Sequence, residues 1–272
     1  MKAMGGSSRR SVFVALMAPL VIVGAAAAER LPVLHLVIDD VGLRRDALIP
    51  FLKIDGMVRD STWAIIPSGR HAGRHGKRLR AAGATLFVHV PMEPQKRSAM
   101  TPALGEYLEM DDSPTVLREK LARSFGRLPA RVRDVIRGLN NHQGSALTEK
   151  RRSMDVVMKE LKVRALCFLD SRTTSDTSGP IAAEGAGVPF VERDVFIDNV
   201  RDAALIRKQL DEALAIARRE GSAVAIGHPY PETAEALAQW LSEHRRKVVL
   251  KPLCTEDAGD DKAKRRPRKR PR

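Results

Sequence analysis

The sequence predicts an α/β fold, an irregular (β/α) barrel of seven to eight strands. Apolar runs of strand length alternate with segments of helical periodicity along residues 31–254, a pattern typical of parallel strands with helices outside. This alternation fits a barrel or an open doubly wound sheet. Polar residues suited to chemistry follow five of the strands, and a barrel brings such strand ends to one mouth, which favours the barrel.

The chain divides by composition into three regions. Residues 1–28 contain Arg9 and Arg10, an apolar stretch and alanines that fit a cleavage site, so they predict a signal peptide and export to the periplasm or cell envelope. An uncleaved membrane anchor is the alternative, because the uncharged stretch is close to the shortest that spans a bilayer. Residues 31–254 are expected to form the folded domain, and residues 255–272 a disordered basic tail.

The formal net charge of +14 and the pI near 10.3 indicate a nucleic-acid binder until the charges are located. Residues 262–272 carry eight basic side chains and no acid, and the leader adds Lys2, Arg9 and Arg10. The remaining chain is much closer to balance, so no nucleic-acid partner is expected. We expect a solvated tail, with weak contact to an anionic membrane or polymer as the alternative.

The two cysteines, Cys167 and Cys254, are too few for a disulfide framework, although they allow one bridge. Cys167 lies inside an apolar strand. Its simplest interpretation is a buried small hydrophobic residue.

The first half of the domain contains four predicted strands, at 33–38, 61–66, 84–89 and 133–139, of which the first three are largely apolar runs of strand length. Helical periodicity interrupted by Pro50 predicts a short or broken helix at 43–54. The basic segment 70–82 is expected to be helical near its end, where Gly83 stops it. Ser113 and Pro114 form a good helix start, continued through 116–125. Residues 95–112 show no period, and a loop of that length could cover a site.

In the second half, Thr148 is expected to cap a helix that runs to residue 164 with apolar side chains on one face. A strand at 165–169, a short helix at 181–185 and a weak strand at 188–191 follow. Gly221 closes the best helix, 203–220. A strand at 222–227 precedes a helix that Pro231 opens and that ends at 244, and the last strand is 247–250.

Polar residues stand at the carboxyl ends of five of these strands. They are Asp39 and Asp40, His89, Asn141 and His142, Asp170 and Arg172, and His228. Because adjacent side chains leaving a strand point in roughly opposite directions, Asp39 and Asp40 are predicted to do two jobs, for example one on a metal and one on a proton. The simpler interpretation is a strand-ending turn in which Gly42 supplies the bend.

One carboxylate and two imidazoles on separate loops make a three-ligand metal site with open positions for water and substrate. We assign the ligands to Asp40, His89 and His142, the general base to Asp39 and the general acid to His228. Each histidine taken alone is more simply a hydrogen-bonded residue near the core. Their joint position on one rim favours the site.

Two other pairs of polar residues have simpler interpretations than a metal site. His71 and His75 have the spacing that puts two imidazoles on one helical face, but Gly73 weakens the helix and the flanking residues are basic, which disfavours a cation. Asp170 and Arg172 could form only a local ion pair.

Five motifs together carry a resemblance to a known family. They are Val37-Ile-Asp-Asp-Val-Gly42, Val88-His-Val-Pro-Met-Glu-Pro94, Asn140-Asn-His-Gln-Gly-Ser145, Phe168-Leu-Asp-Ser-Arg-Thr-Thr174 and Ala225-Ile-Gly-His-Pro229. In this order, over about residues 34–253, the chain resembles the divergent polysaccharide deacetylase family, YibQ-type proteins of bacterial envelopes.

The resemblance implies an irregular (β/α) barrel and a metal-dependent, deacetylase-like hydrolase acting on the amide bonds of acetylated sugars. In the wider group an Asp-Asp motif supplies a base and a metal ligand, histidines complete the metal site, and a late histidine acts as the acid. Carried over, Asp39 is the base, Asp40 and His89 are ligands, and His228 is the acid. The implied cofactor is a divalent metal, most often zinc, and the implied partner an acetylated polysaccharide or glycan.

The chain departs from that group at one ligand. The group takes both histidines from a His-x-x-x-His motif, whereas Glu93 stands four residues after His89 here. The third ligand is therefore His142 or Glu93, and we favour His142. Asp170 could orient His228. The remaining rim residues are expected to contact substrate or support the ligands: Glu93, Asn141, Asp170 and Arg172.

The alternative function is that of a non-catalytic periplasmic envelope protein, which keeps the barrel and binds polysaccharide or a protein. Aromatic residues make up only 4% of the chain, which argues mildly against an extended sugar-stacking groove.

Overall fold

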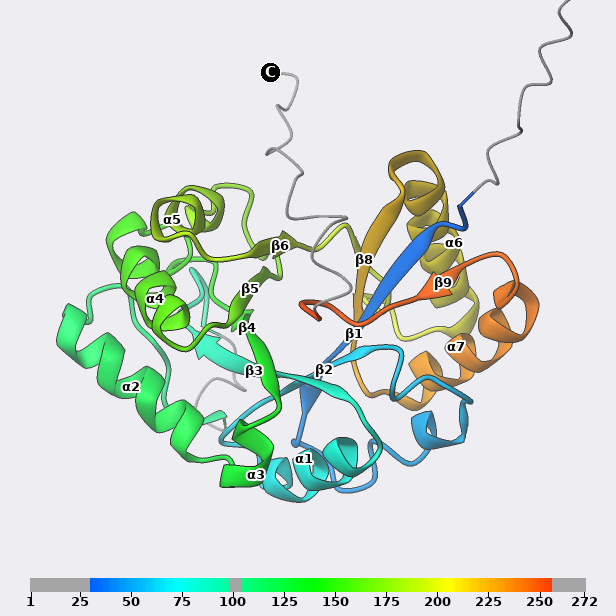
Figure 1. Cartoon of the computed structure of the whole chain (residues 1–272), viewed down its shortest axis with the longest axis horizontal. Helices are drawn as coiled ribbons and strands as arrows, with labels where there is room; N and C mark the ends of the chain where they lie inside the picture. The colour runs from blue at the N-terminus through cyan, green and yellow to red at the C-terminus, as the bar shows by residue number, and fades with distance from the viewer. Residues whose placement is uncertain (1–29, 98–103, 256–272) are drawn as a thin grey trace, which may run out of the picture. The chain divides into compact units, whose positions relative to one another are not determined.

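The computed structural model describes residues 30–97 and 104–255, so the predicted leader and residues 256–272 of the predicted tail lie outside it. Within these residues, parallel strands join in one sheet in the order β6-β5-β4-β3-β2-β1-β8-β7, and β9 also pairs with β1 (Figure 1). The strands are β1 (Val33–Val41), β2 (Thr62–Ile65), β3 (Thr85–Met92), β4 (Ile136–Gln143), β5 (Cys167–Asp170), β6 (Phe190–Glu192), β7 (Val195–Phe196), β8 (Ser222–Gly227) and β9 (Val249–Leu250).

The sheet curves into an irregular barrel, which confirms the predicted fold class. In the described part of the chain, β6 and β7 are the two ends of the hydrogen-bonded order and do not pair with each other. The two residues between them bridge the gap. Arg193 donates its backbone N–H to Asp170 O on the β5 side at 3.0 Å, and Asp194 donates to Val224 O on β8 at 2.9 Å.

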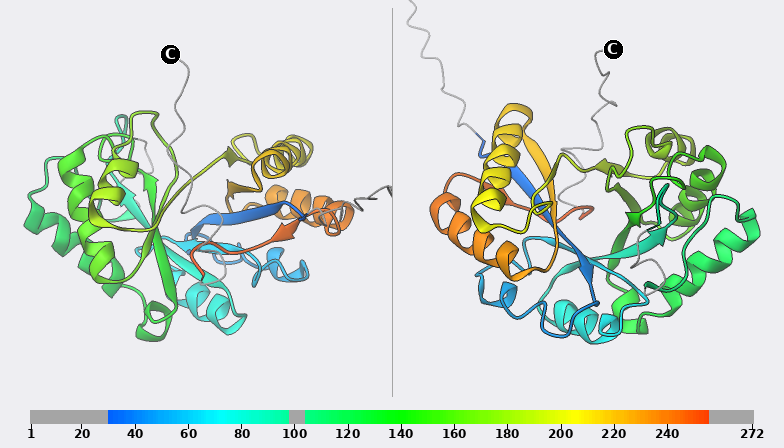
Figure 2. Two further views of the ribbon diagram at one scale, coloured as in Figure 1. Left: turned by 45° about the horizontal axis from the view of Figure 1, so that its top comes forward. Right: turned by 180° about the vertical axis from the view of Figure 1, so that it is seen from behind.

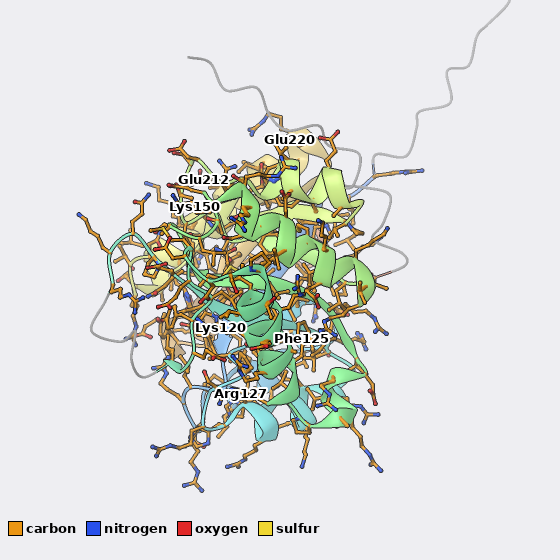
Figure 3. The ribbon with its side chains drawn as sticks, turned by 90° about the vertical axis from the view of Figure 1, so that its left-hand side faces the viewer. Lys120, Phe125, Arg127, Lys150, Glu212 and Glu220 are labelled. Atoms are coloured by element: carbon orange, nitrogen blue, oxygen red, sulfur yellow. A yellow bond between two sulfur atoms is a disulfide. The ribbon has the colours of Figure 1, made fainter. Side chains whose placement is uncertain are left out.

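Helices cover the outer face of the sheet (Figure 1, Figure 2). They are α1 (Ala72–Ala81), α2 (Pro114–Gly126), α3 (Ala130–Arg133), α4 (Arg151–Val163), α5 (Gly179–Ala186), α6 (Ala203–Glu220) and α7 (Pro231–His244), with a 3₁₀ turn η1 (Phe51–Lys53) after β1. Charged side chains such as Arg127 and Lys150 project from this layer (Figure 3). Among the described residues, no helix is long and apolar enough to cross a membrane.

The predicted helix starts are only partly correct. Ser113 caps α2, because its Oγ accepts the Val116 N–H at 3.3 Å, as the sequence predicted. The predicted cap at Thr148 is wrong. Its hydroxyl donates to Gly144 O at 2.8 Å, and α4 begins only at Arg151. The region at 43–54 forms only the single 3₁₀ turn η1, consistent with the interruption predicted at Pro50.

Side chains alternate between two cores along each strand, as the pleat requires. Outward positions such as Leu36, Ile38 and Val88 pack with the helices in the larger apolar cluster. Inward positions such as Val37 and Phe87 form a second, smaller cluster inside the barrel. This alternation decides which residues at the strand ends point into the barrel mouth.

The segment that follows β9 closes the barrel at the amino ends of the strands. Lys251 O accepts a bond from His35 Nδ1 at 2.8 Å, Leu253 N donates to Thr62 Oγ1 at 2.8 Å, and Leu253 is buried in the inner cluster. A disulfide joins Cys167 of β5 to Cys254, with their Cα atoms 6.4 Å apart. The prediction that Cys167 is simply a buried apolar residue is therefore wrong, because Cys167 forms a disulfide with Cys254.

The bridge constrains a long stretch of chain. Its two cysteines are 87 residues apart in sequence, and a crosslink of that span stabilises a fold by roughly 4 kcal/mol if loop-closure entropy dominates. Gly138 makes room for it, because a Cβ there would lie 2.6 Å from the Phe87 ring and 2.7 Å from Cys167 Sγ.

Candidate metal centre and acid–base residues

Five polar residues reach the barrel mouth because each continues the inward row of its strand. They are Asp39 after Val37 in β1, His89 after Phe87 in β3, Asn140 and His142 after Gly138 in β4, and His228 after Ile226 beyond β8. The strands run further than predicted, so all but His228 lie within strand ends rather than past them. Side-chain parity therefore places four of the predicted residues in the mouth, Asp39, His89, His142 and His228, together with Asn140.

Asp40 has the wrong parity for the mouth and reaches it by a change of backbone. Its φ is +56°, a left-handed conformation that few residues other than glycine adopt. The sequence predicted that the side chains of Asp39 and Asp40 point in opposite directions. That prediction is wrong, because the left-handed backbone turns Asp40 toward the mouth as well. His89 Nε2 lies 3.6 Å from Asp39 Oδ2 and 3.4 Å from Asp40 Oδ1, so both carboxylates approach the same imidazole.

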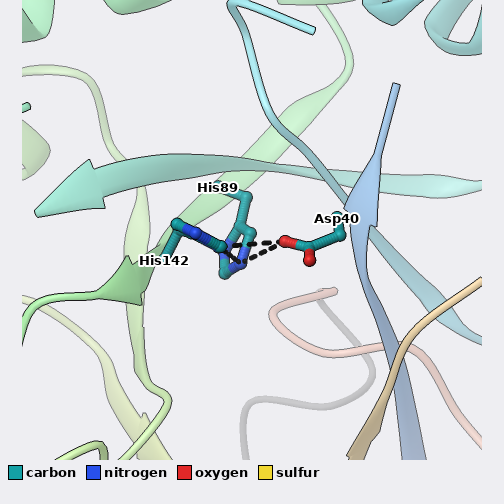
Figure 4. Close-up of side chains that lie close together, drawn as sticks. All are labelled: Asp40, His89 and His142. Carbon is teal, nitrogen blue, oxygen red and sulfur yellow. Dashed lines mark hydrogen bonds and ion pairs between the residues drawn. The ribbon is translucent and has the colours of Figure 1, made fainter. Parts of the chain in front are cut away.

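Asp40, His89 and His142 direct one atom each toward a common point (Figure 4). Asp40 Oδ1 lies 2.9 Å from His142 Nδ1 and 3.4 Å from His89 Nε2, and the two nitrogens are 3.3 Å apart. His89 is buried, while Asp40 and His142 are partly exposed. The three atoms thus form a small triangle at the barrel mouth.

These residues fit a divalent metal. Zinc bonds imidazole nitrogen and carboxylate oxygen at about 2.0–2.1 Å, so tetrahedral geometry places two ligand atoms about 3.3 Å apart. The observed edges of 2.9, 3.3 and 3.4 Å bracket that value. Three protein ligands also leave a position for water or substrate, which is the pattern of catalytic rather than structural zinc.

The electrostatics of the triangle favour an ionised carboxylate. Burial opposes the charge of Asp40, but hydrogen bonds and the charges of His142 and His89 hold the pKa of Asp40 well below its usual range. Burial likewise opposes the charged form of His89, yet Asp39 and Asp40 raise its pKa. The carboxylates therefore attract positive charge to this point, whether it is carried by protons or by a metal ion.

Asp39 is held beside the triangle as a separate group. It is buried, and Asn140 Nδ2 donates to its Oδ1 at 2.9 Å. Burial raises the pKa of Asp39, although His89 and His228 partly oppose this. A fixed carboxylate with a raised pKa suits proton transfer, because a base works best when its pKa is near the working pH. The sequence analysis did not predict a role for Asn140 in the site. The signal that could have shown it is the position of Asn140 on the inward face of β4, two residues after Gly138.

His228 is oriented by Asp198 and not by Asp170, so that prediction was wrong. His228 Nδ1 bonds Asp198 Oδ1 at 2.9 Å, and the backbone N–H of His228 donates to Asp198 Oδ2 at 2.6 Å. Thr233 Oγ1 donates to the same carboxylate at 2.7 Å. The sequence missed Asp198 because it follows β7, a two-residue strand without a periodic signal.

The other nitrogen of His228 faces the triangle. His228 Nε2 lies 3.9 Å from Asp40 Oδ2. Burial opposes the charged form, but the hydrogen bond and charge of Asp198 raise the pKa of His228 to about 9. The imidazole is therefore protonated at neutral pH and can donate a proton into the mouth.

Comparison with known proteins agrees with this arrangement. Residues 36–255 match the family model described as divergent polysaccharide deacetylase. The chain belongs to this family.

Two curated proteins are similar in sequence to this family member. The uncharacterized protein YibQ of Escherichia coli (strain K12) is 32% identical over 209 residues, which cover 76% of this chain and 62% of YibQ. An uncharacterized protein of Haemophilus influenzae (strain ATCC 51907 / DSM 11121 / KW20 / Rd) is 35% identical over 210 residues, covering 76% of this chain and 70% of that protein. The aligned part thus spans less than two thirds of YibQ.

Solved structures show the same fold for the deacetylase-family domain. An uncharacterized protein from Agrobacterium tumefaciens C58 superposes with a TM-score of 0.75 at 22% identity, covering 84% of this chain and 90% of that one. A mutant of a CE4 family pseudoenzyme with restored enzymatic activity superposes with a TM-score of 0.53 at 14% identity, covering 83% and 67% of the two chains.

The remaining predicted residues of this deacetylase-family chain lie around the centre without joining it. Asp170 has outward parity and accepts bonds from Thr177 Oγ1 and the Arg172 N–H, both at 2.7 Å. Arg172 Nη1 forms its ion pair with Glu192, at 2.9 Å, and not with Asp170 as predicted. Asn141 Oδ1 accepts the Ser171 N–H at 2.9 Å and so ties β4 to β5.

Glu93, the alternative third ligand, is engaged elsewhere. Its Oε2 accepts the Met110 N–H at 2.8 Å, and its Oε1 lies 3.6 Å from Arg97 Nη2. Glu93 thus contacts the segment 95–112 near both of its ends, at Arg97 and Met110. The structure brings His142, and not Glu93, to Asp40 and His89.

Proposed function

We propose that this protein is a metal-dependent hydrolase, most simply a zinc enzyme, that removes acetyl groups from amino sugars of an envelope polysaccharide. The observation that carries the proposal is the triangle of Asp40, His89 and His142, whose edges match the ligand spacing of tetrahedral zinc. The family supplies the reaction class, and the acetylated saccharide is the substrate that this class implies.

The bound metal would supply Lewis-acid chemistry, lowering the pKa of water and polarising the acetyl carbonyl. Asp39 would accept a proton from the attacking water, because Asn140 fixes its carboxylate and burial raises its pKa. The new bond joins the water oxygen to the carbonyl carbon, and the C–N bond breaks to give acetate and a free amine.

His228 would supply the proton that the departing nitrogen needs. Its Nε2 faces the triangle, and Asp198 holds the ring through Nδ1. Because Asp198 raises the pKa of His228 to about 9, the acid form is present at neutral pH. The proposed reaction requires an ionised Asp39 and a protonated His228 at its start, as a base and an acid.

We further propose that the protein works outside the cytoplasm, in the periplasm or cell envelope. The Cys167–Cys254 bridge supports this, because disulfides persist mainly in oxidising compartments. The leader composition of residues 1–28 points the same way. Detection of the chain in periplasmic rather than cytoplasmic fractions tests this part.

The central test uses the full chain purified without added chelator. Elemental analysis should find about one zinc or similar divalent ion per chain, and incubation with N-acetylated chitooligosaccharides should release acetate. Treatment with a chelator should abolish acetate release, and readdition of zinc should restore it. An apo protein prepared in the same way but kept without metal is the matched control.

The opposite result would point to the alternative of a non-catalytic envelope protein. A chain that binds no divalent ion and releases no acetate from neutral or acidic acetylated saccharides contradicts the hydrolase. The fold similarity to a CE4 family pseudoenzyme is the observation that keeps this alternative in view.

A further inference from the structure

An aromatic and cationic cluster lies on the acid side of the candidate centre. The ring of His228 is 5.3 Å from the ring of Tyr230, which is the residue before α7. The Arg44 guanidinium lies 4.8 Å from the centroid of the Tyr230 ring, and the Arg201 guanidinium lies 4.3 Å from it. Two cations thus meet one aromatic ring directly beside the proposed acid.

Both guanidiniums are held in place by hydrogen bonds. Arg44 Nη2 donates to Pro229 O at 3.1 Å, and Arg201 Nη2 contacts Glu232 at 3.2 and 3.3 Å. Cation–π contact with Tyr230 adds to this positioning. Arginines that are fixed in advance lose less entropy when they bind a ligand, so the arrangement is suited to recognition.

The two arginines differ in their ion pairs. Glu232 pairs with Arg201, whereas no carboxylate lies within ion-pair distance of Arg44 anywhere in the described residues. Both arginines are exposed. An anion beside Arg44 would meet guanidinium N–H donors that no carboxylate occupies.

We propose that Arg44 and Arg201 bind an anionic group, a carboxylate or a phosphate, on the saccharide beside the acetylated position. This inference rests on the proposed function and narrows its substrate to an acidic polysaccharide. An acetyl amide is neutral, so the anion must belong to a neighbouring sugar or to another substituent of the same sugar.

The test measures binding rather than turnover. The full chain carrying Asp39→Asn, which should not hydrolyse substrate, is titrated by calorimetry with a heparosan tetrasaccharide, in which glucuronate alternates with N-acetylglucosamine. The matched neutral ligand is N-acetylated chitotetraose. A second pair, N-acetylglucosamine 6-phosphate against N-acetylglucosamine, separates phosphate from carboxylate as the source of charge.

We expect the acidic member of at least one pair to bind about tenfold or more tightly than its neutral partner, with a preference that shrinks at high salt. Arg44→Gln or Arg201→Gln should weaken acidic binding about tenfold and leave neutral binding within about twofold. Arg44→Lys should retain part of the preference. Arg207→Gln is the control, because Arg207 is a partly exposed arginine on α6 that pairs with Glu243.

Three results would overturn the inference: equal affinity for the acidic and neutral members of both pairs, equal weakening of both members by Arg44→Gln, or no binding of any of the four saccharides. Tight acidic binding without acetate release by the metal-loaded wild-type chain would instead refute the hydrolase and leave this site in place.

Discussion

Two pairs of histidines in the described part of this molecule lie within 6 Å of each other, yet only one of the two pairs resembles a metal centre. The rings of His89 and His142 are 5.0 Å apart, and those of His71 and His75 are 5.9 Å apart. The first pair comes from two parallel strands, and the second from a single helical turn at the start of α1.

The surroundings of the two pairs are opposite in charge. His89 and His142 share Asp40 Oδ1, with Asp39 close by. Around the second pair, His75 Nε2 donates to Arg45 O at 2.9 Å, and Arg74 and Arg78 lie near enough to disfavour protonation. Spacing along a helix therefore brings imidazoles together, but convergence of strand ends is what adds the carboxylates that a cation needs.

The largest expected effect separates the pairs by metal binding. His142→Ala or Asp40→Ala should lose the bound ion and reduce kcat/KM for acetate release by about 10³-fold or more, because one of three ligands is gone. His71→Ala should keep one ion per chain and nearly full activity. Elemental analysis and acetate assays on the three variants check this, and loss of metal from His71→Ala would reverse the assignment.

The second effect separates the metal site from the base. Asp39→Asn keeps the triangle and should still bind one ion, while kcat falls about 10²–10⁴-fold, which is the usual contribution of a general base. Metal content and steady-state rates measured on the same preparation show whether Asp39 is a general base or a metal ligand. Equal loss of metal and activity would make Asp39 a ligand instead.

The third effect concerns the carboxylate behind the acid. Asp198→Asn should lower kcat about 10–100-fold with little change in metal content, because His228 loses its orientation and its raised pKa. The alkaline limb of the pH–rate profile should move to lower pH, since the acid would deprotonate earlier. Asp170→Asn is the matched buried control, and we expect it to change thermal stability but alter kcat less than about threefold.

The smallest effect is a pH dependence of stability in the second pair. Burial lowers the pKa of His75, and the charges of His71, Arg74 and Arg78 lower it further. The unfolded chain therefore binds a proton more readily than the folded one, so stability should fall as pH drops below about 6.5. His75→Gln should flatten this decline, by less than about 3 °C in Tm between pH 7 and pH 5. An unchanged slope would show that other groups cause it.

Much of the fold was predictable because strong local signals coincide with it. The bounds of α6, β8 and α7 match the sequence prediction at both ends, since Gly221 and Pro231 punctuate them. The alternation of inward and outward positions also places His89, His142 and His228 once the strands are known. These are properties of short stretches that the sequence displays directly.

The missed features depend on distant contacts. The left-handed Asp40 cannot be read from a strand pattern, and β7 is too short to show one, which hid Asp198. The partner of Cys167 lies 87 residues away, so only the closed barrel reveals the bridge. Local sequence thus predicted which strands carry the chemistry, while tertiary contacts decided which carboxylate meets which imidazole.

The floor of the barrel has a consequence for how the chain is made. Its last pieces, β9 and the residues up to Cys254, are also the last part of the domain to be synthesised, yet they pair with β1 at the very beginning. A growing chain can arrange its first strands but cannot seal them until this segment arrives. Products that stop short of Cys254 should therefore stay open to proteases, because the Cys167–Cys254 bridge cannot form in them.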